Sequence, residues 1–351
     1  MALPLGRLRE YLQKSYGFRG FRGDQVFSWM HGKRVRSFRE MTNVAKDARC
    51  LLARRERLTL PEEAGRLTAS DGTVKLLLRM ADGEPAESVL IPEEQRLTAC
   101  LSTQVGCRMG CAFCMTGAAG FHRQLGADEI VAQLYALQDS ADRRISNVVL
   151  MGMGEPLDNP DAVEDALSII TDDRGICIGT RKITVSTVGI PRGIRRLQEL
   201  AGSWGLALSL HSAVQSTRER LIPPARRWQL PEVRRALLDY ARAKGRRVTL
   251  EYCLIDGVND SREEADALVR FASGLPCKIN LIVYNPVKGL DWKRPSNGAV
   301  DAFAAWLYPR CPAVTVRRSR GRDVAAACGQ LGASLTGTPH GDGGILTHIR
   351  D

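Results

Sequence analysis

Segments of strand and helix character alternate along the chain from about residue 97 to residue 317. Short apolar runs predict strands at 98–104, 147–152, 182–187, 206–211, 247–254, 278–284 and 313–317. Longer amphipathic runs between them predict helices at 127–138, 161–170, 192–201, 231–244, 261–273 and 299–307. The alternation indicates an α/β fold with a parallel sheet covered by helices, either an open doubly wound sheet or a full or partial barrel.

The chain as a whole divides into four predicted zones. They are a helical segment at 1–60, a small antiparallel connector at 61–96, the α/β core at 97–335 and a glycine-rich flexible tail at 336–351. In the first zone, Gly17, Gly20 and Gly23 are predicted to separate a first helix from a second. In the second zone, the turn-forming sequences SDG and DG lie beside strand-like runs at 74–80 and 86–91.

Three cysteines lie close together in the run VGCRMGCAFC: Cys107, Cys111 and Cys114. The C-x3-C-x2-C spacing supplies three thiolates to a four-iron cluster and leaves one iron without a protein ligand. An open iron can bind a small molecule and pass an electron into it. Zinc is the alternative, but a zinc site usually has paired C-x2-C motifs or added histidines, and His122 is the only histidine nearby.

Polar residues stand at or just after the ends of several predicted strands: Glu155, Ser186, Ser209, His211 and Asn285. The carboxyl ends of parallel strands meet at one edge of a sheet, where such folds bind ligands. The cysteine run also follows a predicted strand, so all these residues are expected to converge on one site. In the turn GMGEP, glycines allow close approach to a ligand, and Glu155 can accept a hydrogen bond from an ammonium group.

Positive charge is concentrated near the N-terminus. The net charge is +11, and residues 1–60 hold fourteen Lys or Arg against five Asp or Glu. Aromatic residues are interleaved with these cations: Tyr11, Tyr16, Phe18, Phe21, Phe27, Trp29 and Phe38. Cations among stacking platforms favour a nucleic acid partner, and a second basic run at 218–247 adds to this. The alternative is a solvated basic face on a helical domain whose aromatic residues form its core.

Composition also argues against several classes of protein. No run is long and apolar enough to span a membrane, and the first residues lack the apolar segment of a signal peptide. Ten cysteines in such a chain argue against a disulfide framework and for a reducing compartment. We therefore expect a cytoplasmic, basic monomer with no membrane partner.

With Phe113 before its last cysteine, the cysteine run has the pattern C-x3-C-x-aromatic-C, and the chain resembles radical S-adenosylmethionine (SAM) enzymes. The segments FRGDQVFSWMH, AESVLIP, CLSTQVGC, GMGEP, LALSLHS, CKINL, YNP and RGRDVAAACGQL resemble the radical SAM RNA adenine methyltransferases more closely. This resemblance implies a partial (β/α) barrel and a [4Fe-4S] cluster held by Cys107, Cys111 and Cys114. It also implies a SAM site that includes Gly154, Glu155, Ser186, Ser209, Leu210, His211 and Asn285.

The resemblance further implies a use for two more cysteines, because adenine carbons 2 and 8 carry no nucleophilic lone pair for direct displacement on SAM. In the family's chemistry one SAM methylates Cys328, and a radical derived from a second SAM takes a hydrogen from that methyl group. The carbon radical adds to adenine, Glu87 matches the proposed proton acceptor, and Cys100 forms a disulfide with Cys328 to release the product. The remaining cysteines are interpreted as small buried hydrophobic residues: Cys50, Cys177, Cys253, Cys277 and Cys311.

We therefore expect methylation of an adenine ring carbon in 23S rRNA and also in tRNA. The sequences SDGTVK and FHRQL favour carbon 2. A carbon-8 resistance enzyme, a relative with another target adenine, a radical SAM enzyme with a non-RNA substrate, and a non-enzymatic RNA-binding or zinc module are the alternatives. A reducing electron donor such as flavodoxin or ferredoxin is implied as a partner.

Overall fold

The structure is a computed structural model that describes residues 2–58, 60–287, 289–311, 313–317 and 320–332. Its strands are β1 (Glu62–Thr68), β2 (Val74–Arg79), β3 (Pro85–Pro92), β4 (Leu97–Cys100), β5 (Gln104–Gly106), β6 (Phe121–Gln124), β7 (Asn147–Leu150), β8 (Ile183–Thr187), β9 (Gly205–Ser209), β10 (Val248–Leu254), β11 (Cys277–Val283) and β12 (Val314–Arg317). Its helices are α1 (Leu5–Tyr16), α2 (Gly20–Phe27), α3 (Lys46–Arg55), α4 (Met115–Ala118), α5 (Ala127–Asp139), α6 (Pro160–Thr171), α7 (Pro191–Glu199), α8 (Gln215–Leu221), α9 (Leu230–Lys244), α10 (Arg262–Ala272) and α11 (Asn297–Leu307).

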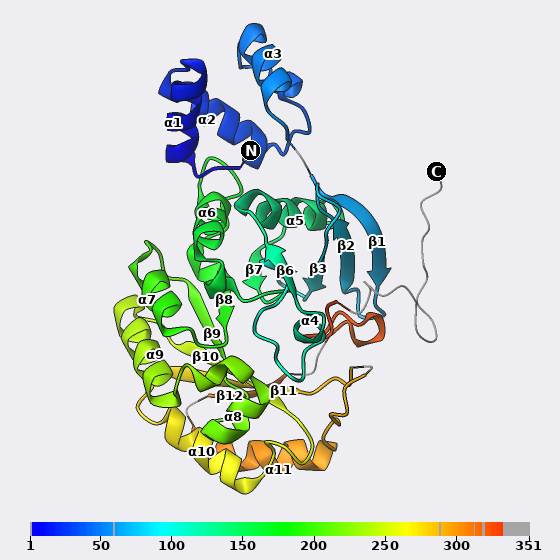
Figure 1. Cartoon of the computed structure of the whole chain (residues 1–351), viewed down its shortest axis with the longest axis vertical. Helices are drawn as coiled ribbons and strands as arrows, with labels where there is room; N and C mark the ends of the chain where they lie inside the picture. Colours follow the sequence, from blue (N-terminus) through cyan, green and yellow to red (C-terminus); the bar gives the residue numbers. More distant parts are fainter. Residues whose placement is uncertain (1, 59, 288, 312, 318–319, 333–351) are drawn as a thin grey trace.

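One large sheet runs in the order β1-β2-β3-β4-β7-β8-β9-β10-β11-β12, while β5 and β6 form a separate antiparallel pair. From β4 to β12 every pairing in the sheet is parallel. A doubly wound sheet reverses its strand order, and this order never reverses. The sheet is therefore a curved partial barrel with α6, α7, α9, α10 and α11 along its outside (Figure 1). The expected α/β class is confirmed, and the doubly wound alternative is excluded.

The strands of residues 61–96 continue this same sheet. Both strand-like runs form strands, β2 and β3, and an additional strand, β1, precedes them. β3 pairs antiparallel with β4, which places Val89 opposite Cys100. The antiparallel strands thus lie directly against the first strand of the parallel region, close to the later site.

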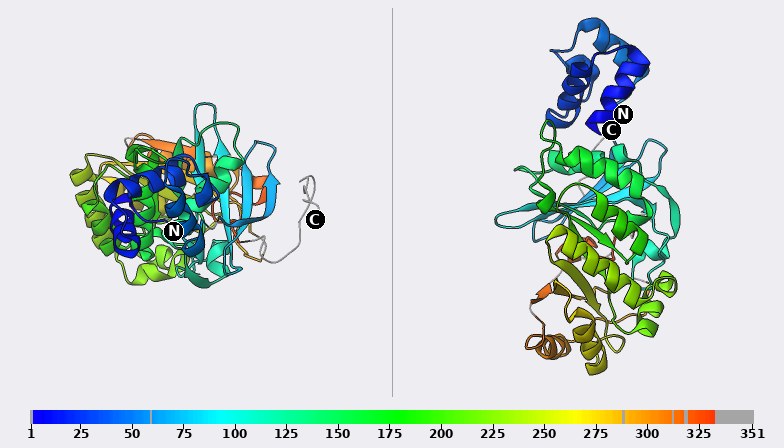
Figure 2. Two further views of the ribbon diagram at one scale, coloured as in Figure 1. Left: turned by 90° about the horizontal axis from the view of Figure 1, so that it is seen from above. Right: turned by 90° about the vertical axis from the view of Figure 1, so that its left-hand side faces the viewer.

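The N-terminal helices stand at one end of the molecule (Figures 1 and 2) but share its main apolar core. Gly17 ends α1 in the left-handed conformation, with φ of 67°. Gly20 and Gly23, by contrast, lie inside α2 instead of between the helices. A Cβ at Gly23 would lie 2.7 Å from Cγ of Arg9, so this glycine permits close packing of α2 on α1. The expected role of Gly20 and Gly23 as helix separators is therefore wrong.

Most N-terminal aromatic residues belong to the core. Phe27 and Phe38 are buried, and a second group is partly buried against the same core: Tyr11, Tyr16, Phe18 and Trp29. Phe21 is the exception, because 52% of its surface is exposed. Free stacking on bases is therefore excluded for Phe27 and Phe38, and it stays a prediction for Phe21.

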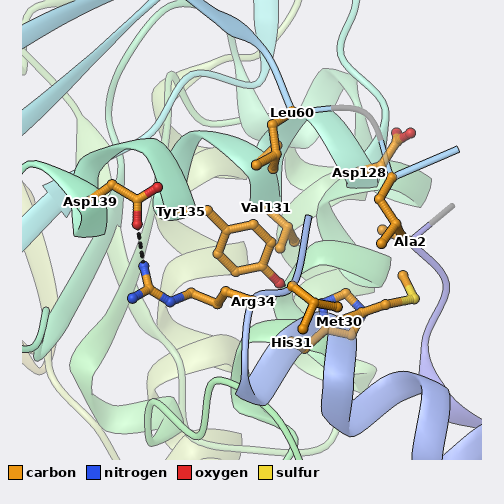
Figure 3. Close-up of a pocket in the computed structure, with 12 residues that line it drawn as sticks. Ala2, Met30, His31, Arg34, Leu60, Asp128, Val131, Tyr135 and Asp139 are labelled. Atoms are coloured by element: carbon orange, nitrogen blue, oxygen red, sulfur yellow. Dashed lines mark hydrogen bonds and ion pairs between the residues drawn. The ribbon is translucent and has the colours of Figure 1, made fainter. Parts of the chain in front are cut away.

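The N-terminal helices meet α5 at a small cavity (Figure 3). His31 Nδ1 and the Tyr135 hydroxyl are 2.5 Å apart, and burial lowers the pKa of His31 to about 3, so this contact is uncharged at neutral pH. At the rim, Arg34 is 2.8 Å from an Asp139 carboxylate oxygen. The contact between the N-terminal helices and α5 therefore combines a buried neutral hydrogen bond with an exposed ion pair.

No helix in the described part of the chain has both the length and the apolar character needed to cross a bilayer.

β5 ends at Gly106, directly before the first cysteine of the run, and two glycines there allow a controlled comparison. Gly106 has φ of 72°, and a Cβ on it would lie 1.9 Å from the carbonyl oxygen of Gly120. Gly120 has φ of 82°, but a Cβ on it would meet nothing within 4 Å. We predict that Gly106→Ala lowers the free energy of unfolding by roughly 2–5 kcal/mol, from overpacking plus backbone strain. Gly120→Ala should lose only the strain, roughly 1–2 kcal/mol. Urea unfolding measures both, and equal losses would contradict the steric explanation.

Candidate active site

One cavity brings together most of the residues singled out by the sequence. Its lining includes Cys107, Cys111, Cys114, Gly154, Glu155, Ser186, Ser209, His211 and Cys328. These residues come from the loops after β5 and β7, from β8 and β9, and from the C-terminal segment that follows β12. The carboxyl ends of neighbouring parallel strands therefore meet at this cavity, as they do in other barrels of this kind.

Four of the residues singled out lie away from the cavity lining. Leu210 is buried in the core, and its backbone N–H donates to the carbonyl of Glu251. Asn285 is buried, and its Oδ1 accepts a hydrogen bond from Arg294 at 3.3 Å. Cys100 and Glu87 are buried beside the C-terminal segment that carries Cys328. A direct contact of the Leu210 side chain with a ligand in the cavity is therefore not supported.

The cysteine loop is held in place by its backbone. The N–H of Cys107 donates to Gly120 at 2.7 Å, and the N–H of Ala112 donates to Leu221 at the end of α8 at 2.9 Å. The indole of Trp292 donates to the carbonyl of Ala112 at 2.8 Å. The loop shape is thus fixed by β6, by α8 and by the segment after β11, independently of what the thiols bind.

The three thiols are close enough to influence one another. Burial raises the pKa of Cys107 to about 12 and that of Cys111 well above its usual value, and the negative charge of Cys114 raises both further. Within the described residues no group of three or more His, Cys, Asp or Glu is arranged to hold a metal ion. A single zinc ion needs its thiolate sulfurs at about 2.3 Å from one point, whereas a four-iron cluster spreads its thiolates over a larger body.

Arg218 supplies an independent test of what these thiols hold. Its guanidinium is wholly buried and donates to the carbonyl of Val188 at 2.5 Å, while Nε and Nη1 have no hydrogen-bond partner among the residues that the structure describes. Burial lowers its pKa to about 10, and the charge of Cys111 acts in the opposite direction. A buried cation with unpaired N–H groups is costly unless a negative charge lies nearby. An anionic cluster on the three thiolates would provide that charge, so the residues present fit such a cofactor.

The basic run of residues 218–247 is only partly a surface feature. Arg218 is buried, Arg234 donates to the carbonyl of Phe271 at 2.9 Å, and Arg246 donates to the carbonyl of Ser203 at 2.6 Å. These arginines satisfy backbone carbonyls of the protein itself. These three arginines therefore offer no free cation to a polyanion, and binding of a polyanion by the rest of the run stays a prediction.

The GMGEP turn is shaped by the protein as well as by any ligand. A Cβ at Gly154 would lie 2.6 Å from Cβ of Gln104, so the turn packs tightly on the segment after β4. Glu155 is buried and accepts hydrogen bonds from the backbone N–H groups of Val188 at 2.8 Å and Leu157 at 3.1 Å. Burial nevertheless raises the pKa of Glu155 to about 7. A bound ammonium group beside this carboxylate would favour its ionised form.

His211 offers a hydrogen-bond donor to the cavity. It has φ of 56°, and its Nδ1 accepts a hydrogen bond from the backbone N–H of Cys253 at 3.0 Å. The single proton of the neutral ring therefore lies on Nε2. Burial lowers the pKa of His211 to about 3, so the ring stays neutral, and it packs edge-on against Phe113 with ring centres 4.7 Å apart.

Several lining residues escaped the sequence reasoning, among them Glu251, Cys253 and Arg317. Cys253 is buried, as expected for a small hydrophobic residue, but it also borders the cavity, and burial together with the charge of Cys328 raises its pKa. Arg317 has a raised pKa chiefly because of the charge of Cys328. Arg317 ends β12, so the rule about strand ends could have found it, whereas Glu251 and Cys253 lie inside the buried strand β10. Cys177 is exposed, which makes its expected burial wrong.

Comparisons with known proteins agree with this site. The family profile of the Radical SAM superfamily matches residues 101–271, and that of the ribosomal RNA large subunit methyltransferase N-terminal domain matches residues 1–57. The crystal structure of a radical SAM methyltransferase from Sphaerobacter thermophilus is similar, with a TM-score of 0.90 and 41% sequence identity. That similarity covers 95% of this chain and 98% of the other. Fold and site together define a radical SAM methyltransferase, a class that uses a [4Fe-4S] cluster and SAM.

Sequence relatives narrow the class. The dual-specificity RNA methyltransferase RlmN of Nitratidesulfovibrio vulgaris (strain DSM 19637 / Miyazaki F) is 45% identical over 343 residues, which cover 95% of this chain and 93% of the relative. The probable dual-specificity RNA methyltransferase RlmN of Salinibacter ruber is 43% identical over 328 residues, which cover 90% of this chain and 89% of the relative. The chain belongs to the RlmN family of radical SAM RNA methyltransferases.

Arg218 gives a prediction about the cofactor that does not depend on turnover. Reduction adds a negative charge to the cluster, and a buried cation stabilises the reduced form. We predict that Arg218→Met lowers the reduction potential by roughly 60 mV, a tenfold change for a one-electron couple. The apoprotein should not lose thermal stability, because an unpaired buried charge has been removed. Redox titration followed by electron paramagnetic resonance measures the potential. Arg220→Met is the matched control, because Arg220 is an exposed arginine on the same helix. An equal shift in Arg220→Met would contradict the role of burial.

Proposed function

We propose that the protein methylates carbon 2 of an adenine in RNA, in 23S rRNA and in tRNA, through a methyl group carried on Cys328. The observation that supports this most directly is the single cavity shared by the cysteine run, the strand-end residues and Cys328. The relatives named dual-specificity RNA methyltransferases support an RNA substrate. The match of residues 1–57 to the N-terminal domain of a ribosomal RNA methyltransferase supports the proposed division into an RNA-binding unit and a catalytic core.

In this proposal Cys107, Cys111 and Cys114 hold the cluster, which with SAM supplies an electron and thereby a radical able to abstract hydrogen. Glu155 receives the ammonium group of SAM. Contacts to the carboxylate, ribose and adenine of SAM are assigned to Ser186, Ser209 and His211, and the Oγ atoms of the two serines are 3.5 Å apart. Asn285 is buried outside the cavity lining and accepts a hydrogen bond from Arg294, so its contact with SAM stays a prediction.

The two remaining cysteines differ in readiness to react. Cys328 is exposed to the cavity, and although burial of its sulfur raises its pKa, the positive charge of Arg317 lowers it. Arg317 therefore favours the thiolate that must accept a methyl group from SAM. Burial raises the pKa of Cys100 to about 12, so Cys100 is a protonated thiol at neutral pH. This difference between the two thiols suits a reaction in which Cys328 is modified first and Cys100 attacks last.

All ten cysteines lie in the described part of the chain, and each is free there.

Glu87 requires movement to act as the proton acceptor. Its carboxylate is wholly buried, 3.4 Å from Nζ of Lys75, and it does not border the cavity. A proton leaving the adenine ring reaches Glu87 only if the segment carrying Cys328 shifts or water enters.

The electron donor, proposed to be a small reducing protein such as flavodoxin or ferredoxin, acts before these steps. The enzyme is proposed to work as a monomer.

The decisive experiment is anaerobic reaction of the iron-loaded enzyme with unmodified ribosomal and transfer RNA, followed by mass spectrometry of the nucleosides. We expect 2-methyladenosine from both RNAs. Cys328→Ala should yield none, whereas Cys177→Ala should match the parent, because Cys177 is exposed and lies outside the cavity lining. Formation of 8-methyladenosine would transfer the assignment to carbon 8. An intact cluster with no methylated adenosine would refute the proposal.

Binding of RNA by the N-terminal unit is tested at Phe21. Phe21 is 52% exposed between Arg19 and Arg22, and the Arg22 guanidinium lies 5.2 Å from the centre of its ring. Stacking of one base on an aromatic ring contributes roughly 1–3 kcal/mol, so Phe21→Ser should weaken RNA binding roughly 5–150-fold. Tyr308→Ser is the control, because Tyr308 is similarly exposed, at 54%, but lies after α11. Equal affinities of parent and Phe21→Ser in a filter-binding assay would remove Phe21 from the interface.

A further inference from the structure

A buried ion pair lies behind the segment that carries Cys328. This segment, residues 320–332, is called the Cys328 loop below. Lys75 on β2 is 3% exposed and Glu87 on β3 is fully buried, and their charged atoms are 3.4 Å apart. Leu77 lies opposite Glu87 in the antiparallel ladder, so Lys75 and Glu87 occupy a diagonal pair of positions on one face of the sheet.

Both members of the pair also bind the Cys328 loop. Nζ of Lys75 donates to the carbonyl of Ala325 at 3.2 Å, three residues before Cys328. Oε2 of Glu87 accepts a hydrogen bond from the backbone N–H of Gly332 at 2.5 Å, four residues after Cys328. The pair therefore holds the loop on both sides of the reactive cysteine, from strands that lie outside the parallel barrel.

The loop has little regular structure to hold it otherwise. One short 3-10 turn at Arg322–Val324 is its only helical or strand element within the described residues. Other side-chain contacts include Asp71, which accepts from the N–H of Gly321 at 3.0 Å, and Thr116, which donates to the carbonyl of Leu331 at 2.8 Å. The side chains of Asp323 and Gln330 also bond to backbone outside the loop, and the backbone N–H of Met115 donates to the carbonyl of Gly329 at 2.8 Å. Lys75 is the only cation outside the loop with a described hydrogen bond to the loop backbone.

We propose that Lys75 is a positioning residue, which with Glu87 clamps the Cys328 loop so that the sulfur of Cys328 faces the cavity. The inference rests on the proposed function for the importance of Cys328, but the clamp itself does not. Two buried charges lose their hydration, and excellent geometry with further hydrogen bonds is needed to offset that loss. Here the loop backbone provides those further hydrogen bonds, so clamp and loop stabilise each other.

The clamp also explains how the loop can be released. Glu87 attracts Lys75 only while it is ionised, and a carboxylate accepts a stronger hydrogen bond from Gly332 than a neutral carboxyl does. When Glu87 receives the proton of the adenine ring through water that enters the site, the ion pair is lost. The loop is then freed at the stage at which Cys328 must meet Cys100. Glu87→Gln imitates the neutral form and therefore tests this release directly.

Hydrogen exchange followed by mass spectrometry on the iron-loaded, full-length enzyme tests the clamp. In Lys75→Met we expect amides of residues 326–332 to exchange at least tenfold faster, with unchanged iron content and unchanged exchange in β10 and β11. Glu87→Gln should show the same direction. Lys182→Met is the control, because Lys182 is an exposed lysine before β8, far from the loop in the sequence, and its exchange should match the parent. Parental exchange of residues 326–332 in Lys75→Met would overturn the proposal.

A second pair of measurements separates positioning from general stability and from the proposed function. If Lys75→Met does not fold, the double variant Lys75→Met with Glu87→Gln removes the orphaned buried carboxylate and restores stability. Parental loop exchange in the folded double variant would also overturn the clamp. In the reaction, Lys75→Met should still cleave SAM but form at least tenfold less methylated adenosine per 5′-deoxyadenosine than Lys182→Met. If Lys75→Met forms as much methylated adenosine per 5′-deoxyadenosine as Lys182→Met, Lys75 does not position the loop. If the parent forms no methylated adenosine, only the proposed function is refuted.

Discussion

Charge removed from water is the constraint on which this site depends. Arg218 beneath the cysteine loop, Glu155 in the GMGEP turn and the pair of Lys75 and Glu87 are all buried, and each would be unstable without a specific partner. The partners differ: backbone N–H groups and an expected ammonium for Glu155, an expected anionic cluster for Arg218, and the backbone of the Cys328 loop for the ion pair. Some of the partners of these buried charges are therefore supplied by the protein itself, and the others are expected from bound ligands.

Much of the fold follows from local sequence. The seven predicted strands of the parallel region were found because buried parallel strands are short apolar runs, as in β10, where every residue is buried. The helices between them were predicted to within a few residues, because their apolar residues recur at helical spacing. β1 was missed because its residues, EEAGRLT, include four polar side chains and a glycine, and α8 was missed because QSTRERL is almost entirely polar. β1 is the edge strand of the sheet and pairs with β2, the next strand along the chain.

Site residues that belong to a local sequence motif were predicted. Site residues brought together only by the tertiary fold were missed. The cysteine run and the strand-end residues needed only spacing and position. Lys75 and Glu251 look like ordinary charged residues on strands, and nothing local indicates that β2 lies against the C-terminal segment. The composition of the N-terminal segment predicted too many aromatic residues free to stack on bases. Most of them pack in the core instead, because a basic helical unit needs aromatic residues for its own core as much as for stacking.

The cysteine loop and the Cys328 loop are held in place by different kinds of contact. The cysteine loop is fixed through backbone hydrogen bonds to Gly120 before β6 and to Leu221 at the end of α8, and through the indole of Trp292. The Cys328 loop is fixed mainly through side chains, two of them ionised, and a change of one charge alters its anchorage. Electron transfer benefits from a cofactor that does not move, whereas Cys328, in the proposed function, has to reach first the methyl donor, then the base and finally Cys100, and therefore requires a loop that can be released. The antiparallel strands β2 and β3, which add nothing to the barrel's ligand-binding edge, supply that releasable anchor.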